Sequence, residues 1–179
     1  MKQILSQFTK EQVKKASDIK AIFFDVDGVL TDGKIIYDHE GKESKQFNVK
    51  DGYIISHLKK AGIIVGIITG RDSKVVSFRA NELKLDFCHQ GIVNKLEVLE
   101  KLVQFYKLKK KQVAYIGDDI NDIGALKNCG LSVCPADAMS YLKDKVDLVT
   151  KSKGGQGVVR EVADLVLAAS GQLEKIVKG

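Results

Sequence analysis

Two aspartates one residue apart, Asp25 and Asp27, have the residue type and spacing for phosphoryl chemistry. The apolar run at residues 21–24 predicts a short buried strand before them, and Gly28 allows a sharp turn after them. Carboxylates this close repel each other unless a cation compensates, and Mg2+ binds one or two carboxylates together with phosphate and water. Asp25 is then a candidate nucleophile toward phosphorus, and Asp27 a candidate acid and base. The alternative is that both only cap a helix or a turn.

The composition of the 179-residue chain is that of a globular protein, with 44% hydrophobic and 29% charged residues. This length predicts one domain with a single large core. No apolar stretch approaches the ~20 residues that a membrane span needs, and the first residues lack the apolar segment of a secretory signal. The sequence therefore predicts a cytoplasmic protein with no membrane partner. The three cysteines lack metal-ligand spacing and indicate reduced core residues.

The net charge of +6 does not by itself indicate a nucleic-acid partner. Its lysines are scattered, and the one dense run, residues 107–111, follows a predicted helix, whose C-terminal end favours cations. We interpret this run as a solvated face and expect no nucleic acid. A positive field also attracts an anionic substrate.

Predicted strands and helices alternate along the chain. Strands are predicted at residues 21–24, 63–68, 85–88, 113–116, 131–133 and 147–149. Helices are predicted at residues 3–17, 54–61, 92–106 and 158–169 and around Val75, Val76, Arg79 and Leu83, with residues 49–53 as a polar loop. The alternation predicts an α/β fold with a doubly wound, Rossmann-like parallel sheet and a β-hairpin at residues 33–48 after the first strand. We divide the chain into a helical extension, residues 1–17, and a single domain, residues 18–179, with a C-terminal tail at residues 152–179.

Three of the predicted strands stop at polar clusters. The clusters are Asp25 and Asp27, Thr69 and Arg71, and Asp118, Asp119 and Asp122. Ligands of parallel α/β sheets bind beyond the carboxyl ends of the strands, where the strand order reverses. We therefore expect these clusters to meet in one site.

The side chains of these clusters, together with Lys95, suit phosphoryl transfer, which requires cations and hydrogen-bond donors around the phosphate. Thr69 can donate to a phosphoryl oxygen, and Lys95 is a suitable counter-ion. Asp118 offers a second carboxylate to Mg2+, while Asp119 and Asp122 can hold water ligands or Lys95. Singly, each has a structural alternative: a helix cap, a surface lysine or a turn.

Residues 18–170 resemble the haloacid dehalogenase-like phosphatases in four ordered motifs. The motifs are Asp25-Val-Asp27-Gly-Val-Leu-Thr-Asp, Thr69-Gly-Arg71, Lys95, and Gly117-Asp118-Asp119-x-Asn121-Asp122. The resemblance implies that Asp25 is the nucleophile, that Asp27 is the acid and base, and that Thr69 and Lys95 assist them. It also implies Mg2+ held by Asp25, the Asp27 carbonyl and Asp118, with Asp119, Asn121 and Asp122 behind these ligands.

The chain has no long insertion between these motifs and is similar to the capless branch of the family. This similarity implies no cap domain and a homotetramer in which the hairpin forms the oligomer core and subunits shield one another's sites. The stretch after residue 153, Gly154-Gly155-Gln-Gly157, then becomes a lid over a neighbouring site that Arg160 helps to position. Its alternative is a flexible lead into the last helix.

Asp51-Gly-Tyr, Gln90-Gly91 and Gly-Gly-x-Gly-x-x-Arg160-Glu resemble the sugar-acid phosphatases of that branch. They imply a phosphorylated sugar acid as the substrate: 3-deoxy-D-manno-octulosonate 8-phosphate, an intermediate of lipopolysaccharide synthesis. The alternatives are a nine-carbon substrate, ketodeoxynononate or N-acylneuraminate 9-phosphate, and a non-catalytic scaffold. Arg71 favours the eight-carbon acid, because relatives that act on nine-carbon acids tend to lack this arginine.

The substrate-binding residues implied by the resemblance are Asp27, Lys50, Asp51, Thr69, Gly70, Arg71, Arg79 and Lys95. Arg71 and Arg79 are candidates for the sugar acid's carboxylate, which arginine binds with two hydrogen bonds. Arg79 has the alternative of a surface ion pair. Lys50 departs from the family pattern, in which an arginine usually precedes the Asp-Gly pair.

Overall fold

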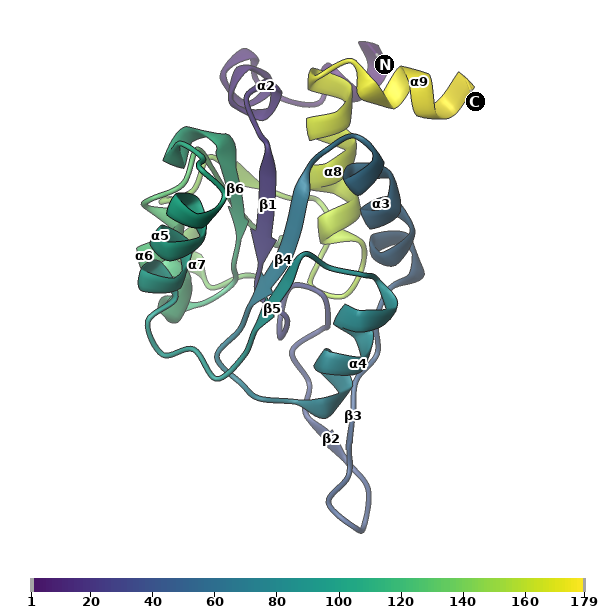
Figure 1. The fold of residues 1–179 in the computed structure, drawn as a ribbon, viewed down its shortest axis with the longest axis vertical. Helices are drawn as coiled ribbons and strands as arrows, with labels where there is room; N and C mark the ends of the chain where they lie inside the picture. The colour runs from purple at the N-terminus through teal and green to yellow at the C-terminus, as the bar shows by residue number, and fades with distance from the viewer. Residues whose placement is uncertain (1, 179) are drawn as a thin grey trace.

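The computed structural model describes residues 2–178 as a six-stranded parallel sheet with helices on both faces (Figure 1). The strands are β1 (Ala21–Phe24), β4 (Ile64–Ile68), β5 (Phe87–His89), β6 (Val113–Ile116), β7 (Leu131–Cys134) and β8 (Leu148–Val149). Their order is β5-β4-β1-β6-β7-β8, so the chain builds outward from β1 on one side and then returns to place β6 on the other. This confirms the predicted doubly wound fold and puts the reversal of strand order between β1 and β6.

Central strand β1 is fully buried and separates the two halves of the core. Ile22 and Phe24 belong to the hydrophobic cluster of one face, and Ala21 and Phe23 to that of the other, as the alternation of a strand requires. Helices α3 (Val49–Lys60), α4 (Lys74–Glu82) and α8 (Val158–Ala169) cover the first face. Helices α5 (Lys95–Phe105), α6 (Ile123–Leu126) and α7 (Ser140–Lys143) cover the second (Figure 1).

The predicted hairpin is confirmed and projects beyond the carboxyl ends of the strands (Figure 1). Its strands β2 (Ile36–Tyr37) and β3 (Glu43–Ser44) pair antiparallel around a turn that Asp38 closes by accepting hydrogen bonds from two backbone N–H groups. Among residues 2–178 no further domain is inserted beside it, in keeping with the expectation that a cap is absent.

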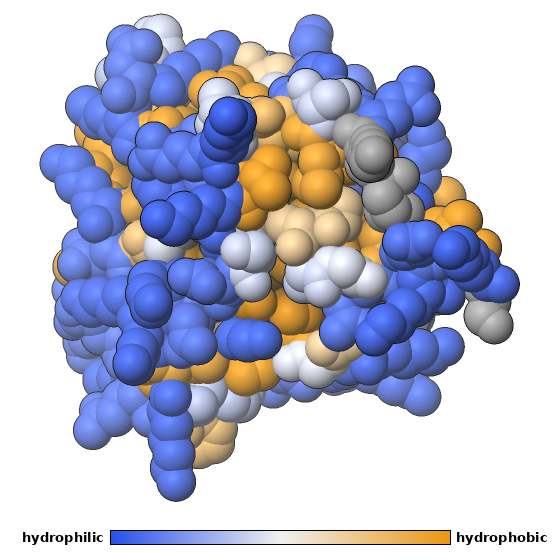
Figure 2. Space-filling model, turned by 90° about the horizontal axis from the view of Figure 1, so that it is seen from above, coloured by the Kyte–Doolittle hydropathy of each residue, from blue (hydrophilic) through white to orange (hydrophobic). Residues whose placement is uncertain are grey.

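The predicted single helix at residues 3–17 is wrong. Two helices, α1 (Lys2–Leu5) and α2 (Lys10–Ser17), are separated at Thr9, whose hydroxyl accepts from the Gln12 N–H while the Gln12 side chain accepts from the Thr9 N–H. Apolar side chains of both helices pack on the core next to α8. Figure 2 looks down on this end and shows apolar surface between the polar side chains. The sequence also failed to predict α7 and the last helix, α9 (Gln172–Lys178).

Helix α3 begins at Val49, so the predicted polar loop at residues 49–53 is instead its first turn. Asn48 caps it by accepting a hydrogen bond from the Lys50 N–H at 2.9 Å. Gly52 lies in this turn, where a Cβ atom would come within 2.4 Å of the Arg79 guanidinium. The helix-breaking glycine therefore serves close packing against α4.

Residues 154–157 make close contacts with their own chain, so the alternative of a flexible lead is wrong, whereas the lid over a neighbouring subunit's site stays a prediction. The Gly155 N–H donates to the Val29 carbonyl at 3.0 Å, and the Gly154 N–H donates to Asp137 at 2.9 Å. A Cβ atom on Gly154 would lie 2.2 Å from the Gly28 carbonyl oxygen. The glycines thus permit close contact with the loop after β1, which a flexible lead would not make.

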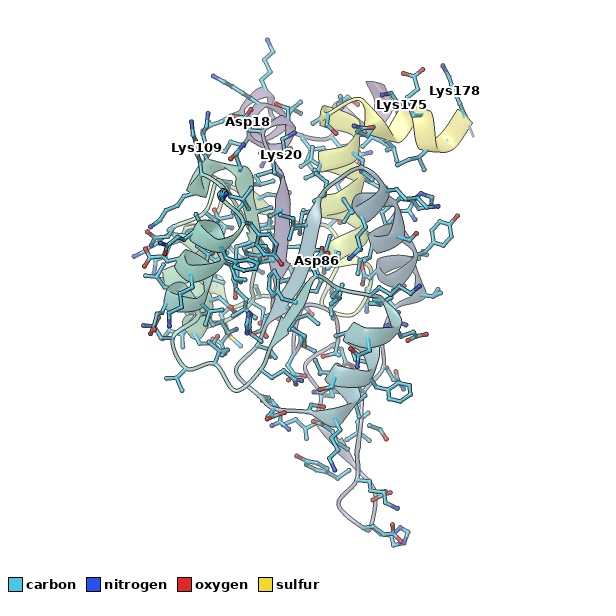
Figure 3. The ribbon with its side chains drawn as sticks, viewed as in Figure 1. Asp18, Lys20, Asp86, Lys109, Lys175 and Lys178 are labelled. Carbon is cyan, nitrogen blue, oxygen red and sulfur yellow. The ribbon has the colours of Figure 1, made fainter. Side chains whose placement is uncertain are left out.

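Charged side chains far from the strand tips account for part of the net charge. Lys20 and Lys109 lie at the end of the molecule opposite the hairpin, as do Lys175 and Lys178 on α9 (Figure 3). Across residues 2–178, no helix combines the length and apolar character required to cross a membrane.

Asp51 joins α3 to α8. Its carboxylate accepts a hydrogen bond from the Arg160 N–H at 2.7 Å in the first turn of α8, where Gly157 at the N-cap offers no side chain. Its other oxygen has no hydrogen-bond partner among residues 2–178. Burial raises the pKa of Asp51 from 3.8 to about 6, although the hydrogen bond from Arg160 opposes the rise.

We expect Asp51→Asn to remove a pH dependence of stability. Because the folded-state pKa of Asp51 lies above its unfolded value, the contribution of this group to stability is fully present below about pH 4 and is lost as the pH rises through 6. The rise in pKa corresponds to at most roughly 3 kcal/mol, lost by the wild-type protein above about pH 7. The amide of the variant keeps an oxygen for the Arg160 N–H but carries no charge.

The measurement is urea unfolding of both proteins at about pH 5 and pH 7.5, with the exposed Asp18→Asn as control. The free energy of unfolding should fall with pH in the wild type and in the control, and less in Asp51→Asn. Parallel pH dependence in all three proteins would contradict the assignment.

Candidate active site

A buried lysine, Lys95, connects two of the predicted acidic clusters. Its Nζ lies 2.5 Å from Asp25 Oδ2 and 2.7 Å from Asp122 Oδ1, and its side chain is fully buried. Asp25 directly follows β1, and Asn94 caps the N-terminus of α5, which starts at Lys95. Burial lowers the pKa of Lys95, but the two carboxylates outweigh this effect and raise it, so the lysine stays cationic.

Asp122 is committed to organising the loop after β6. Its Oδ1 accepts from the Tyr115 hydroxyl at 2.8 Å as well as from Lys95, and its Oδ2 accepts from the backbone N–H groups of Asp118 and Asp119 at 3.1 and 3.3 Å. Both oxygens are thus fully used. This arrangement fixes the backbone that carries Asp118.

The acidic side chains fit a hard divalent cation. Carboxylate oxygens of Asp25, Asp118 and Asp122 lie within 4.8 Å of one another. Burial, together with the charges of Asp122 and Asp25, raises the pKa of Asp118 to about 7, and the single lysine does not offset it. Since Asp122 is saturated, Asp25 and Asp118 are the carboxylates that remain for an ion, and Mg2+ prefers such oxygen ligands.

A cavity of about 250 Å³ opens at these strand ends. It is lined by Asp25, Asp27, Gly33, Thr69, Gly70, Arg71, Asp118, Asp119 and Asn121. The structure therefore brings together the predicted residues that follow β1, β4 and β6, three neighbouring strands of the sheet. Their roles in catalysis are not decided by this proximity alone and stay predictions.

Three predicted substrate-binding residues lie outside the cavity that contains Asp25. Lys50 lines a different cavity beside Arg160, and Asp51 caps α8. Arg79 pairs with Glu82 at 2.7 Å and lies over the Phe47 ring. For Lys50 and Asp51 the physical reason is that α3 starts at Val49, so the stretch expected to be a loop is the first turn of a helix that packs against α8. Within one chain, these residues do not line the cavity that contains Asp25.

The sequence reasoning missed two hairpin residues at the site. Lys45 forms an ion pair with Asp27 Oδ1, and its side chain is 1% exposed. Glu43 accepts a hydrogen bond from Arg71 Nη2 at 3.0 Å and one from the Ser73 hydroxyl. The available signal was the Glu-x-Lys spacing, because residues i and i+2 of a strand share one face.

Comparison with known proteins agrees with this geometry. Residues 85–162 match the haloacid dehalogenase-like hydrolase family. The 3-deoxy-D-manno-octulosonate 8-phosphate phosphatase KdsC of Yersinia pestis is 44% identical over 162 residues, 90% of this chain and 87% of that one. The Escherichia coli K12 protein of the same name is 43% identical over 163 residues, 91% and 87% of the two chains.

A solved structure is similar over nearly the whole chain. It is the 3-deoxy-D-manno-octulosonate 8-phosphate phosphatase of Moraxella catarrhalis in complex with a magnesium ion, a phosphate ion and a KDO molecule. The two structures superpose with a TM-score of 0.93 at 39% identity, over 95% of this chain and 98% of the other.

We expect Gly28→Ala to weaken divalent-ion binding. A Cβ atom at Gly28 would lie 2.0 Å from Asp118 Oδ2, so the carboxylate must move. Isothermal titration with MgCl2 should show at least a roughly tenfold weaker affinity, about 1.4 kcal/mol.

Gly41→Ala is the matched control. Gly41 also has a positive φ, 75° against 85° for Gly28, but no atom of residues 2–178 outside its own turn lies within 4 Å of the place where a Cβ atom would stand. Both substitutions carry backbone strain of about 1–2 kcal/mol. Equal Mg2+ affinities for the two variants would show that displacement of Asp118 is not the cause.

Proposed function

The chain belongs to the haloacid dehalogenase-like hydrolase family, and we propose that it is a Mg2+-dependent phosphatase that releases phosphate from 3-deoxy-D-manno-octulosonate 8-phosphate. The observation that carries the proposal is Asp25, held by the buried Lys95 in a cavity that Asp27 and Asp118 also line. The relatives named for this reaction support the substrate, since they match about nine-tenths of the chain.

The first chemical step is displacement at phosphorus. An oxygen of Asp25 forms a bond to phosphorus as the bond from phosphorus to the sugar oxygen breaks, and Asp27 donates a proton to that oxygen. Lys95, and Thr69 as a donor, offset the charge on the phosphoryl oxygens. The Val26 N–H, 2.6 Å from Asp25 Oδ1, fixes the nucleophile's orientation.

The second step regenerates the enzyme. Asp27 accepts a proton from a water molecule as the oxygen of that water bonds to phosphorus. The bond between phosphorus and Asp25 breaks, and phosphate is released. Asp25, Asp118 and the Asp27 carbonyl would hold Mg2+. When bound, the ion supplies the positive charge that lets an anionic phosphate approach an anionic nucleophile.

The position of Arg71 supports a sugar acid as the substrate. Its guanidinium lies at the cavity, held by Glu43 at 3.0 Å and by the Tyr37 hydroxyl at 3.2 Å, and is 40% exposed. It can therefore bind a substrate carboxylate with two hydrogen bonds while it stays close to Glu43 and Tyr37. A non-catalytic scaffold is disfavoured because Asp25, Asp27, Lys95 and Asp118 are all present.

We further propose a homotetramer with shared sites, formed through the hairpin, that acts in the cytoplasm. Ile35, Ile36 and Tyr37 are 52%, 41% and 56% exposed, which is unusual for large apolar residues on one short segment. A neighbouring subunit that covers them could also close the cavity. The free cysteines Cys88, Cys129 and Cys134 accord with a reducing compartment.

We expect Asp25→Asn to abolish phosphate release while the fold persists. The amide cannot attack phosphorus, so turnover should fall by at least roughly 10⁴-fold. Phosphate release is measured with and without Mg2+ on the eight-carbon and nine-carbon phosphates, with thermal unfolding as a control for folding. Retained turnover in the variant would refute the mechanism, and equal wild-type rates on both sugars would refute the substrate assignment.

We expect Ile36→Lys to dissociate the oligomer. A lysine in an apolar interface is left without a partner, which costs several kcal/mol per subunit. Light scattering after size exclusion should report a smaller species than for wild type. Lys34→Met, a change at an exposed hairpin residue paired with Asp32, is the control. An unchanged mass for Ile36→Lys would contradict assembly through the hairpin.

A further inference from the structure

Each aspartate of the Asp25–Asp27 pair has a lysine of its own. Lys95 on α5 pairs with Asp25, and Lys45, just after β3 in the hairpin, pairs with Asp27. The two lysines come from different elements of the fold, and their side chains are 0% and 1% exposed. Lys95 belongs to the motifs found in the sequence, whereas Lys45 lies outside all four of them.

Asp27 depends on contacts from outside its own segment. It lies beyond the end of β1 in a turn that is closed by backbone hydrogen bonds to the Val26 carbonyl, which fix its backbone but not its carboxylate. Its remaining polar contacts are longer: Thr31 Oγ1 at 3.4 Å from Oδ1, and Arg71 Nε at 3.6 Å from Oδ2. The ion pair with Lys45 is the short contact that sets the position of its carboxylate.

The hairpin itself is anchored by a neighbouring side chain on the same face. Glu43, two residues before Lys45, bonds to Arg71 and Ser73 and lies 3.4 Å from Lys45 Nζ. Glu43 thus attaches the hairpin to the segment after β4. Lys45 is left with the carboxylates of Asp27 and Glu43 as its ion-pair partners among the described residues.

Stability alone does not account for a buried lysine at this place. Removing an ammonium from water costs several kcal/mol, and an apolar residue of similar volume often stabilises a protein as well or better. An anchor for the hairpin would therefore not need a charge. The cation is useful where it meets Asp27, whose carboxyl must lie within about 2.6–3.2 Å of the atom that gains or loses its proton.

We propose that Lys45 is a positioning residue that holds the Asp27 carboxylate in the orientation required for both of its proton transfers. The inference rests on the proposed phosphatase function and adds a residue to it. Through Lys45, the hairpin takes part in the chemistry of its own chain, beside any part in assembly. Misplacing a reacting group by about 1 Å can cost about 10²-fold in rate.

The test compares Lys45→Met, Lys45→Arg and the control Lys42→Met. Lys42 lies in the same hairpin and pairs with Glu40, but its side chain is 74% exposed and its partner is remote from Asp27. The substrates are 3-deoxy-D-manno-octulosonate 8-phosphate, whose alkoxide needs a proton to leave, and p-nitrophenyl phosphate, whose phenolate does not. The second substrate also reports the first turnover directly as released nitrophenolate.

For Lys45→Met we expect kcat on the sugar phosphate to fall roughly 10²-fold, with KM within about threefold of wild type. On p-nitrophenyl phosphate, a burst of about one nitrophenolate per site should precede slow turnover, because the first step is spared and the water attack is not. Lys45→Arg should recover at least about tenfold in kcat, since it keeps the cation. Lys42→Met should match the wild type.

A merely structural role would give a different pattern. The kcat of Lys45→Met would then fall equally on both substrates, without a burst, and a loss of folding would appear in thermal unfolding. Equal losses, a raised KM with unchanged kcat, or full activity in Lys45→Met would each overturn the inference. If Lys45→Met does not fold, Lys45→Arg decides: loss of kcat on both substrates alike overturns the proposal, and near wild-type activity supports it. A wild-type protein that releases no phosphate, or an active Asp25→Asn, would instead overturn the proposed function.

Discussion

The buried ion pairs of Lys95 with Asp25 and Asp122 are the interaction on which the site depends. The lysine is the first residue of α5, where the helix dipole disfavours a cation, and it is almost fully buried. Each feature alone would destabilise the fold. The carboxylates of Asp25 and Asp122, within 2.7 Å of the ammonium, offset the cost of burying it and of placing it at a helix N-terminus. The same ion pairs hold the two carboxylates at fixed positions. A residue in so unfavourable a place indicates function more strongly than a motif does.

Sheet topology explains why distant residues reach one another. β4, β1 and β6 are adjacent, and parallel strands lie about 4.8 Å apart, so side chains that follow their carboxyl ends are within reach across the three strands. Thr69, Asp25 and Asp118 follow these strands in that order. Tyr115, on β6 itself, then orients Asp122 from inside the core. The core thus determines the geometry of the polar cluster.

This regularity is also what made the sheet and the central cluster predictable from the sequence. Residues that directly follow a buried strand, such as Asp25, were placed correctly because their position depends on the strand alone. Asp51 was misplaced because Asn48 starts α3 earlier than the glycine at residue 52 suggested. Lys45 was missed because its contact with Asp27 depends on how the hairpin folds back, which local propensity does not determine. The burial of Lys95 was equally invisible, and only its place among the motifs indicated a role.

The size of the cavity limits what one chain can do alone. At about 250 Å³ it lies below the 300–1,000 Å³ that pockets for drug-sized ligands occupy, so it suits a phosphoryl group and its ion better than a whole sugar acid. Arg71 also lines a second cavity with Tyr37 and Glu43 of the hairpin, so the proposed function would place the sugar on that side. There the exposed apolar residues of β2 and the neighbouring Ile35 offer a surface for a second subunit. The proposed function therefore separates chemistry and selectivity in space: the strand ends would carry out phosphoryl transfer, and the hairpin side would determine which phosphate ester is held there.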